Sequence, residues 1–354
     1  MTAPVPLRVL ADFDARRPAA LARAISIVEN QREGFDALLG TLHPRIGRAR
    51  RIGLTGPPGA GKSTVAMRLT AAYREAGLTV GIVAVDPTSP FTGGALLGDR
   101  IRMESVALDS GVYIRSLATR GSLGGLSSAT RAVADVLDAY GFDRILMETV
   151  GVGQSELDIA RAADSSVVVL VPESGDSIQT LKAGLMEIAD IFVVNKADRP
   201  GADRIRMDIE LMLGMRSGET LRNVPAHHGV DLKTLNPARM ARAAAAVEQT
   251  DSWTPPVVRT VASKGEGIGD LITAVDRHFR YLETSGELRR RRRQRLREQV
   301  VTVTEHKLRH RLWRDAATNA FLDSALPALE SGSATPFTVA DELLTRSGNL
   351  LTRT

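Results

Sequence analysis

The sequence alternates short apolar runs with longer stretches in which apolar residues recur every three or four positions. Short apolar runs are typical of buried strands, and the longer period is typical of helices that cover a sheet. The apolar runs are Arg51–Thr55, Thr79–Val85, Val112–Ser116, Ile145–Glu148, Val167–Val171, Ile191–Asn195 and Val257–Val261. This alternation predicts an α/β fold with a mainly parallel sheet and helices on both faces.

Helical patterns also extend before and after the predicted sheet. They cover Arg17–Asn30, Glu33–Leu42, Ile268–Leu282, Gly286–Arg314 and Thr338–Arg346, and an alanine-rich helix is predicted at Pro237–Gln249. We therefore predict three segments: a helical N-terminal extension at 1–48, the sheet domain at 49–283 and a helical C-terminal arm at 284–354.

The first apolar run leads into a glycine-rich turn that fits the phosphate-loop pattern G-x-x-x-x-G-K-[ST]. Glycines in such a turn let consecutive N–H groups point at an anion, and the helix that follows adds its positive dipole end. Lys62 would reach the β- and γ-phosphates and Ser63 would ligate Mg²⁺. The predicted nucleotide-binding residues here are Gly56, Gly59, Ala60, Gly61, Lys62, Ser63 and Thr64.

Two later motifs predict which base is bound. Asn195, Lys196 and Asp198 form N-K-x-D at the end of an apolar run. The Asp198 carboxylate can accept hydrogen bonds from guanine N1–H and the 2-amino group, a donor pattern that adenine lacks. Ser263, Lys264 and Gly265 resemble a loop that touches guanine O6. We therefore predict binding of GTP and GDP rather than of adenine nucleotides.

Acidic residues end two of the apolar runs. Asp86 ends the second run and Glu148 ends the fourth. Carboxyl ends of parallel strands meet at one edge of the sheet, where such acids can hold Mg²⁺ or its waters. N-capping of the next turn is the alternative role for each acid.

Composition and charge limit the partners that we expect. The formal net charge is +5, and much of it lies in one basic cluster at 288–297, but only 4% of residues are aromatic. With few rings on which bases could stack, we expect a solvated helical arm that binds an acidic protein surface, not a nucleic acid. The chain has no cysteine, no long apolar stretch at its start and no run of membrane-spanning length. We therefore expect a cytoplasmic protein with no membrane partner.

Several longer motifs resemble those of the methylmalonyl-CoA-mutase-associated GTPases, a MeaB-like group within the SIMIBI class of P-loop GTPases. They are GPPGAGKST, RGSLGGLSSATR, METVGVGQSE, ESGDSIQTLKAGLMEIADIFVVNKAD and WTPPVV, and the resemblance covers about residues 15–285. It implies a homodimer that docks on an adenosylcobalamin-dependent acyl-CoA mutase. Such a protein uses GTP hydrolysis to gate cofactor delivery and to protect or reactivate the mutase.

The resemblance also implies roles for particular residues. Asp86, Asp99 and Glu148 match the acids around Mg²⁺, to which Ser63 also belongs. Residues 148–156, which include Gln154, match one switch segment, and residues 173–182 match a further switch that signals to the mutase. The implied catalytic residues are Lys62, Glu148, Gln154 and Lys182, and we assign dimerisation to the C-terminal arm.

Two other functions remain open on the sequence alone. A GTPase that delivers another metal to an enzyme would share the nucleotide motifs, but such proteins carry His-rich or Cys-rich tracts. Here the histidine pairs are only His227–His228 and His306 with His310, which we interpret as surface or packing residues. A kinase or transporter-linked ATPase of the same fold would lack the preference for guanine. Which acyl-CoA mutase is served also stays open.

Overall fold

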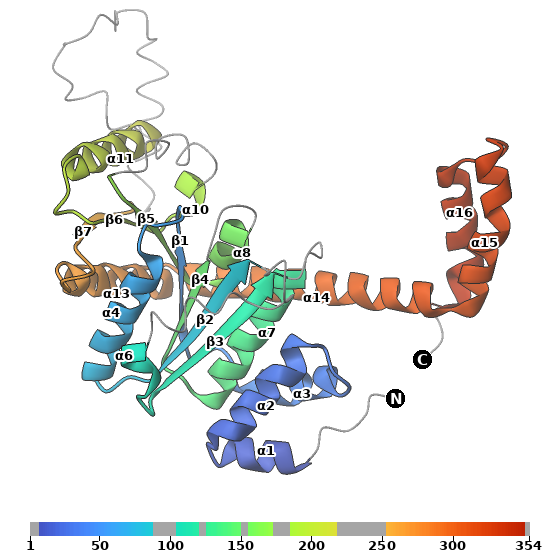
Figure 1. Ribbon diagram of the computed structural model, residues 1–354, viewed down its shortest axis with the longest axis horizontal. Helices are drawn as coiled ribbons and strands as arrows, with labels where there is room; N and C mark the ends of the chain where they lie inside the picture. The colour runs from blue at the N-terminus through green and yellow to red at the C-terminus, as the bar shows by residue number, and fades with distance from the viewer. Residues whose placement is uncertain are drawn as a thin grey trace, which may run out of the picture. The chain divides into compact units, whose positions relative to one another are not determined.

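The computed structural model describes residues 7–87, 104–119, 125–149, 155–172, 185–217 and 253–350. Within these ranges seven strands form one sheet in the order β3-β2-β4-β1-β5-β6-β7, and all neighbours are parallel (Figure 1). The strands are β1 (Arg50–Thr55), β2 (Val80–Pro87), β3 (Val112–Thr119), β4 (Arg144–Thr149), β5 (Ser165–Leu170), β6 (Ile191–Asn195) and β7 (Val257–Thr260). The predicted parallel sheet is confirmed.

Helices cover both faces of the sheet, which is why β5 is buried at every position. On one face lie α4 (Lys62–Glu75) and α13 (Ile268–Thr284), and on the other lie α7 (Gly125–Tyr140), α8 (Ser155–Ala162) and α11 (Ala202–Ser217). Figure 1 shows α4 and α13 on the side of the sheet opposite α7. Two short helices, α6 (Glu104–Ala107) and α10 (Met186–Ile188), complete this part.

The N-terminal helices pack on α7. They are α1 (Leu7–Asp14), α2 (Pro18–Glu29) and α3 (Phe35–Leu42), followed by the 3₁₀ turn η1 (His43–Arg45). Leu21 and Ile25 of α2 are buried in the same cluster as Val133 and Leu137 of α7. Because their apolar faces need α7 to be buried, these helices form part of the same compact body as the sheet.

The chain divides into two compact units, residues 1–292 and 293–354. The helix α14 (Glu287–Arg314) begins in the first unit, and the second also holds α15 (Ala316–Glu330), α16 (Pro336–Arg346) and the turn η5 (Ser347–Leu350). Asp315 caps α15 by accepting a hydrogen bond from the Thr318 N–H at 2.8 Å. The division into 1–48, 49–283 and 284–354 stays a prediction. The predicted helix Pro237–Gln249 and the pair His227–His228 lie outside the described residues.

Two arginines of the basic cluster are used inside the first unit. Arg291 donates to both carboxylate oxygens of Asp190, at 2.9 and 3.0 Å, just before β6. Arg292 donates to the carboxylate of Asp164 at 2.9 Å, just before β5, and to the carbonyl oxygen of Ala49 at 3.1 Å. The expectation of a solvated arm is therefore wrong for these two residues, because they fix the start of α14 to the amino ends of neighbouring strands.

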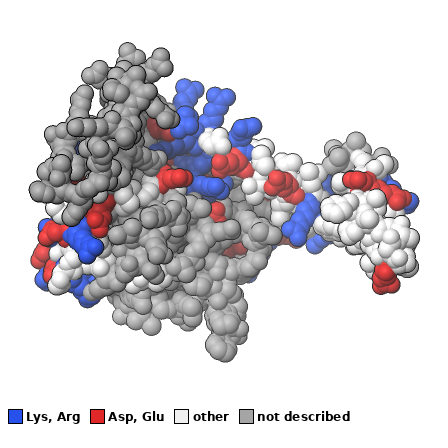
Figure 2. All heavy atoms as spheres, turned by 90° about the horizontal axis from the view of Figure 1, so that it is seen from above, with Lys and Arg blue, Asp and Glu red and all other residues white. Residues whose placement is uncertain are grey.

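Acidic and basic side chains are interspersed on the face shown in Figure 2. No helix in the described ranges is long and apolar enough to cross a membrane.

Candidate functional site

The loop between β1 and α4 turns on glycines that no other residue could replace without strain. Gly56 has a φ of 136°, and a Cβ added there would lie 2.1 Å from the carbonyl oxygen of Val169 on β5. Gly61 has a φ of 86°, and its added Cβ would lie 2.4 Å from the side-chain amide nitrogen of Asn195. Gly59 also has a positive φ, of 75°. The loop therefore needs glycine both for its backbone conformation and for close packing.

Lys62 is the first residue of α4 and lies against this loop. Its ammonium donates to the carbonyl oxygens of Gly56 at 2.7 Å and Pro57 at 3.1 Å, and the residue is only 6% exposed. Ser63 and Thr64 occupy the same first turn and are half-buried. The first turn of a helix has N–H groups without intrahelical partners and the positive end of the dipole. A curved loop, a lysine and a helix N-terminus together suit a polyphosphate.

Glu148 lies on the strand next to the phosphate loop. It stands beside Leu54 of β1 and Ala84 of β2 in the parallel registers, and it is fully buried. Burial of a carboxylate is costly unless a positive charge is close, so this position suits a carboxylate that faces a bound cation. Together with the Ser63 hydroxyl it offers the oxygen donors that Mg²⁺ prefers.

The remaining predicted metal ligands are only partly placed. Asp86 lies in β2 beside Ala118 of β3, but its side chain is outside the described residues, as is the whole of Asp99. Among the described side chains no group of three acids or histidines is arranged to hold a metal. The fit for Mg²⁺ therefore rests on Ser63 and Glu148.

Asn195 connects the phosphate loop with the predicted base loop. Its buried side-chain amide donates to the carbonyl oxygen of Ala60 at 2.8 Å. Its side-chain oxygen accepts from the Thr260 hydroxyl and the Ala262 N–H, both at 3.1 Å. A buried amide that satisfies three partners holds these segments at fixed separation.

The two other residues of N-K-x-D are more exposed. Lys196 has a φ of 55°, an uncommon conformation for a residue with a side chain, which turns the chain out of β6. The carboxylate of Asp198 lies 3.4 Å from the ammonium of Lys264, and these side chains are 43% and 57% exposed. Asp198 and Lys264, both predicted for the base site, thus lie side by side, with the carboxylate accessible to a base.

The base loop itself is a tight turn between β7 and α13. The Val261 N–H donates to the Glu266 carbonyl at 3.1 Å, and the Lys264 N–H donates back to the Val261 carbonyl at 2.9 Å. Ser263 and Lys264 are exposed at the tip, and Gly265 has a φ of 80°. The turn therefore presents the three predicted residues to solvent beside Asp198.

The sequence motifs do not include Arg68, which lies on α4. Its guanidinium donates to the carbonyl oxygens of Ala262 at 3.0 Å and Ser263 at 2.6 Å. The helix that starts at the phosphate loop is thereby attached to the base loop. No local signal marks this residue, because its partners are 194 and 195 positions away along the chain.

The described site therefore contains a phosphate half and a base half. Gln154 and Lys182, predicted to be catalytic, and the segment 173–182 lie outside the described residues. The described part brings Lys62 and Asn195 against one loop and Asp198 beside Lys264.

The comparisons with known proteins agree with this arrangement. The pattern of the family described as methylmalonyl-CoA mutase-associated GTPase MeaB matches residues 21–317. A putative GTPase of Pyrococcus abyssi is 48% identical over 80% of this chain and 79% of its own length. A putative GTPase of Caulobacter vibrioides is 36% identical over 93% of this chain and 94% of its own length.

A solved structure titled LAO/AO transport system kinase superposes with a TM-score of 0.62 at 25% identity, and the match covers 95% of each chain. A glycine turn with a buried lysine, an N-K-x-D strand and a parallel sheet are the parts of a P-loop GTPase. The family pattern covers most of the chain, so the protein is a GTPase and belongs to the methylmalonyl-CoA mutase-associated GTPase family.

Proposed function

We propose that this GTPase acts as a chaperone of an adenosylcobalamin-dependent acyl-CoA mutase. GTP binding and hydrolysis gate delivery of the cobalamin cofactor and protect or reactivate the mutase. The proposal rests on the family match, whose description names association with methylmalonyl-CoA mutase. We also propose that the protein is cytoplasmic and forms a homodimer, in which the two copies contact each other through the C-terminal arm.

In this proposal the described residues divide the work of binding. Lys62 exchanges the carbonyl oxygens of Gly56 and Pro57 for phosphate oxygens of GTP, to which it can donate more strongly because they are charged. Asp198 accepts from the guanine edge, and Asn195 keeps the base loop at the right distance from the phosphates. Bound Mg²⁺ would neutralise charge on the β- and γ-phosphates beside Ser63 and Glu148.

The sequence supplies Gln154 and Lys182 for later steps. Gln154 lies in the switch segment 148–156 and is a proposed catalytic residue, and Lys182 ends the segment 173–182, the proposed relay to the mutase. The phosphate-loop sequence carries no arginine finger, and GTPases that lack one are slow until a partner completes the site. We therefore expect slow hydrolysis that a mutase accelerates.

The test is GTP hydrolysis with and without a purified cobalamin-dependent acyl-CoA mutase, for the wild type, Lys182→Ala and a control. The control is Lys233→Ala, which removes a lysine outside the segment 173–182 and outside the nucleotide motifs. We expect at least about tenfold stimulation of the wild type and the control, a conservative part of the range that partner activation spans. Lys182→Ala should keep its basal rate and lose the stimulation. Full stimulation of Lys182→Ala would place the relay elsewhere. If no mutase of this class stimulates the wild type, the chaperone proposal is wrong. Delivery of another metal to an enzyme then becomes the favoured function.

A further inference from the structure

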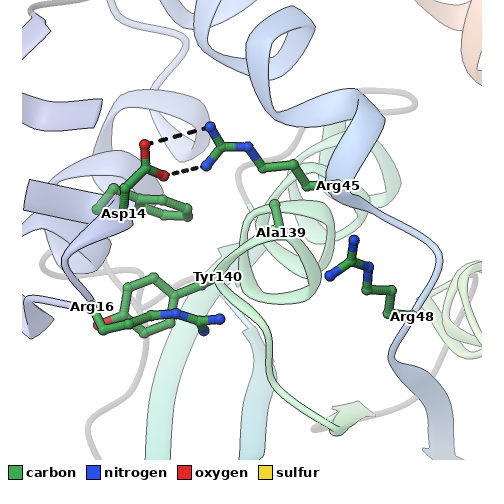
Figure 3. Close-up of a pocket in the computed structure, with 7 residues that line it drawn as sticks. Asp14, Arg16, Arg45, Arg48, Ala139 and Tyr140 are labelled. Atoms are coloured by element: carbon green, nitrogen blue, oxygen red, sulfur yellow. Dashed lines mark hydrogen bonds and ion pairs between the residues drawn. The ribbon is translucent and has the colours of Figure 1, made fainter. Parts of the chain in front are cut away.

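A cavity of about 330 Å³ lies between the N-terminal helices and the end of α7 (Figure 3). Asp14, Arg16, Arg45 and Arg48 line it from the N-terminal part, and Tyr140 closes it from α7. Arg48 precedes the amino end of β1, whereas the phosphate loop follows its carboxyl end. The cavity is therefore separate from the nucleotide site.

The charges around this cavity do not balance. Among the described residues, Arg45 is the one of these three arginines with a carboxylate partner, Asp14. The Arg16 guanidinium lies over the ring of Tyr140, 5.2 Å from its centroid. Figure 3 shows the side chains of Arg16 and Arg48 on different walls of the cavity. Within the part of the chain that the structure describes, Arg16 and Arg48 therefore have no carboxylate partner.

The neighbouring acids are already engaged elsewhere. Asp12 lies 3.3 Å from Arg17, and Asp138 lies 3.0 Å from Arg51. Among the residues that the structure describes, none accepts a hydrogen bond from the guanidinium of Arg48. Arg48 is exposed, so its donors face solvent and are open to a ligand.

The backbone that carries Arg48 is held on two sides. The Asp138 carboxylate accepts from the N–H groups of Gly47, Arg48 and Ala49 at 2.8, 3.1 and 3.0 Å. Arg292 donates to the carbonyl oxygen of Ala49 at 3.1 Å. A side chain with free donors on a fixed backbone loses little backbone entropy when it binds, which favours a binding role.

Arg16 is also exposed, but its guanidinium packs against two neighbours. Its φ is 57°, and a Cβ added to Gly141 would lie 2.5 Å from its guanidinium nitrogens. The guanidinium thus fits between the Tyr140 ring and a position that has no side chain. Burial raises the pKa of Tyr140, so its ring stays neutral and adds no negative charge to the cavity.

We propose that this cavity binds a small molecule that carries a phosphate group. Guanidinium forks bind phosphate oxygens in pairs, and a tetrahedral phosphate can accept from two forks on different walls, whereas a flat carboxylate suits one fork. The volume lies at the lower end of the range for small-ligand sites, and it exceeds that of a single phosphate. A diphosphate or a small phosphorylated metabolite therefore fits better than a free phosphate ion.

The test is calorimetric titration of pyrophosphate into the full-length protein saturated with GDP and without added Mg²⁺, so that the phosphate loop is occupied. The variants are Arg48→Glu and, as the matched control, Arg23→Glu, an exposed arginine of α2 that does not line the cavity. We expect one pyrophosphate per chain for the wild type and the control, and at least about tenfold weaker binding for Arg48→Glu. Arg48→Lys should bind with intermediate affinity, because it keeps charge but loses the fork.

Melting curves would establish that Arg48→Glu is folded, and Arg48→Lys provides a second variant if it is not. The proposal is overturned if the wild type binds no pyrophosphate under these conditions, or if Arg48→Glu and Arg23→Glu bind it equally. It is also overturned if a glutamate-rich peptide binds in an Arg48-dependent way while pyrophosphate, inorganic phosphate and AMP do not. Tighter binding of AMP than of pyrophosphate would support a phosphorylated metabolite as the source of the phosphate.

Discussion

At the scale of single residues, the proposed preference for guanine over other bases depends on the side chain of Asp198. The Asp198 carboxylate is accessible beside Lys264. Its two oxygens can accept hydrogen bonds from the N1–H and the 2-amino group of guanine. In Asp198→Asn the side chain presents a donor as well as an acceptor, which matches xanthine. We expect GTP to bind about 100-fold more weakly and XTP to bind better, since each hydrogen bond to a charged group is worth about 1.5–3 kcal/mol.

Competition with a fluorescent GDP analogue would measure both affinities. The matched control is Asp203→Asn, which changes a more exposed acid on α11 that pairs with Arg259. An unchanged ratio of GTP to XTP affinity in Asp198→Asn would remove this residue from the base site.

A second prediction at the scale of residues concerns Arg68, which joins α4 to the base loop. Its two hydrogen bonds fix the carbonyl groups of Ala262 and Ser263, so Arg68→Ala should loosen the base loop without touching the nucleotide. Both bonds are partly or fully exposed to solvent, so we expect a cost of about 1 kcal/mol, or a roughly fivefold faster release of GDP. Arg68→Lys should give an intermediate rate, because it keeps the charge but not the fork. Stopped-flow release of a fluorescent GDP analogue measures the rate. A merely structural role would lower the melting temperature and leave the release rate unchanged.

At the scale of elements, the start of α14 is joined to the sheet by a buried network around Asp190. Its carboxylate accepts from Arg291, lies 3.3 Å from the ring of His278, and also accepts from the Ser166 N–H at 2.8 Å. His278 in turn lies 2.8 Å from the Ser165 hydroxyl. The helices α13 and α14 and the strand β5 are thus joined by one carboxylate before β6.

This network predicts a dependence of stability on pH. Burial alone would raise the pKa of Asp190, but hydrogen bonds from His278 and Arg291 outweigh it and hold the pKa below its ordinary 3.8. A carboxylate with a lowered folded-state pKa stabilises the protein above its unfolded-state pKa, and that contribution is lost as the pH falls through the folded-state value. The wild type should therefore be more stable to unfolding than Asp190→Asn above about pH 4, and this difference in stability should shrink as the pH falls below 4.

Urea unfolding at pH 5, 4 and 3 checks this expectation. At pH 5 we expect Asp190→Asn to be less stable by about 3 kcal/mol, because the half-buried Arg291 loses the carboxylate that accepts two of its hydrogen bonds. The difference should shrink at pH 3. The control Asp270→Asn alters an exposed acid of α13 and should follow the wild type at each pH. A stability difference that does not change between pH 5 and pH 3 would contradict the assignment.

The elements also mark what the sequence could predict and what it could not. The seven apolar runs predicted the seven strands, since a sheet covered on both faces requires nearly continuous apolar positions. The glycine turn at 56–61 was predictable because its conformation is local. The contacts of Arg68, Arg291 and Arg292 were not, because each joins residues about 100 or more positions apart. The basic cluster therefore looked like a solvated arm, although two of its members, Arg291 and Arg292, are half-buried and bind carboxylates next to the sheet.

At the scale of the whole molecule, the proposed dimer rests on α14. Large apolar side chains are exposed along this helix, and they are Leu296, Val300, Val301, Val303, Leu308 and Trp313. Leu296, Val300 and Val303 are spaced by four and three residues, so they share one face of the helix. These three side chains form a short exposed apolar stripe, and exposed apolar patches mark protein interfaces. We expect a second copy of the chain to cover this stripe.

Val300→Glu should therefore prevent dimerisation, because a carboxylate at the centre of an apolar contact would lose its hydration. Arg309→Glu is the matched control: it lies nine residues further on, which at 3.6 residues per turn is the opposite face of the helix. Light scattering coupled to size-exclusion chromatography should give a dimer for the wild type and Arg309→Glu, and a monomer for Val300→Glu. Because the described residues of the candidate nucleotide site lie within residues 1–292, Val300→Glu should bind GDP as tightly as the wild type. A dimer that persists in Val300→Glu at micromolar concentration would place the interface elsewhere, and a monomeric wild type would refute the dimer.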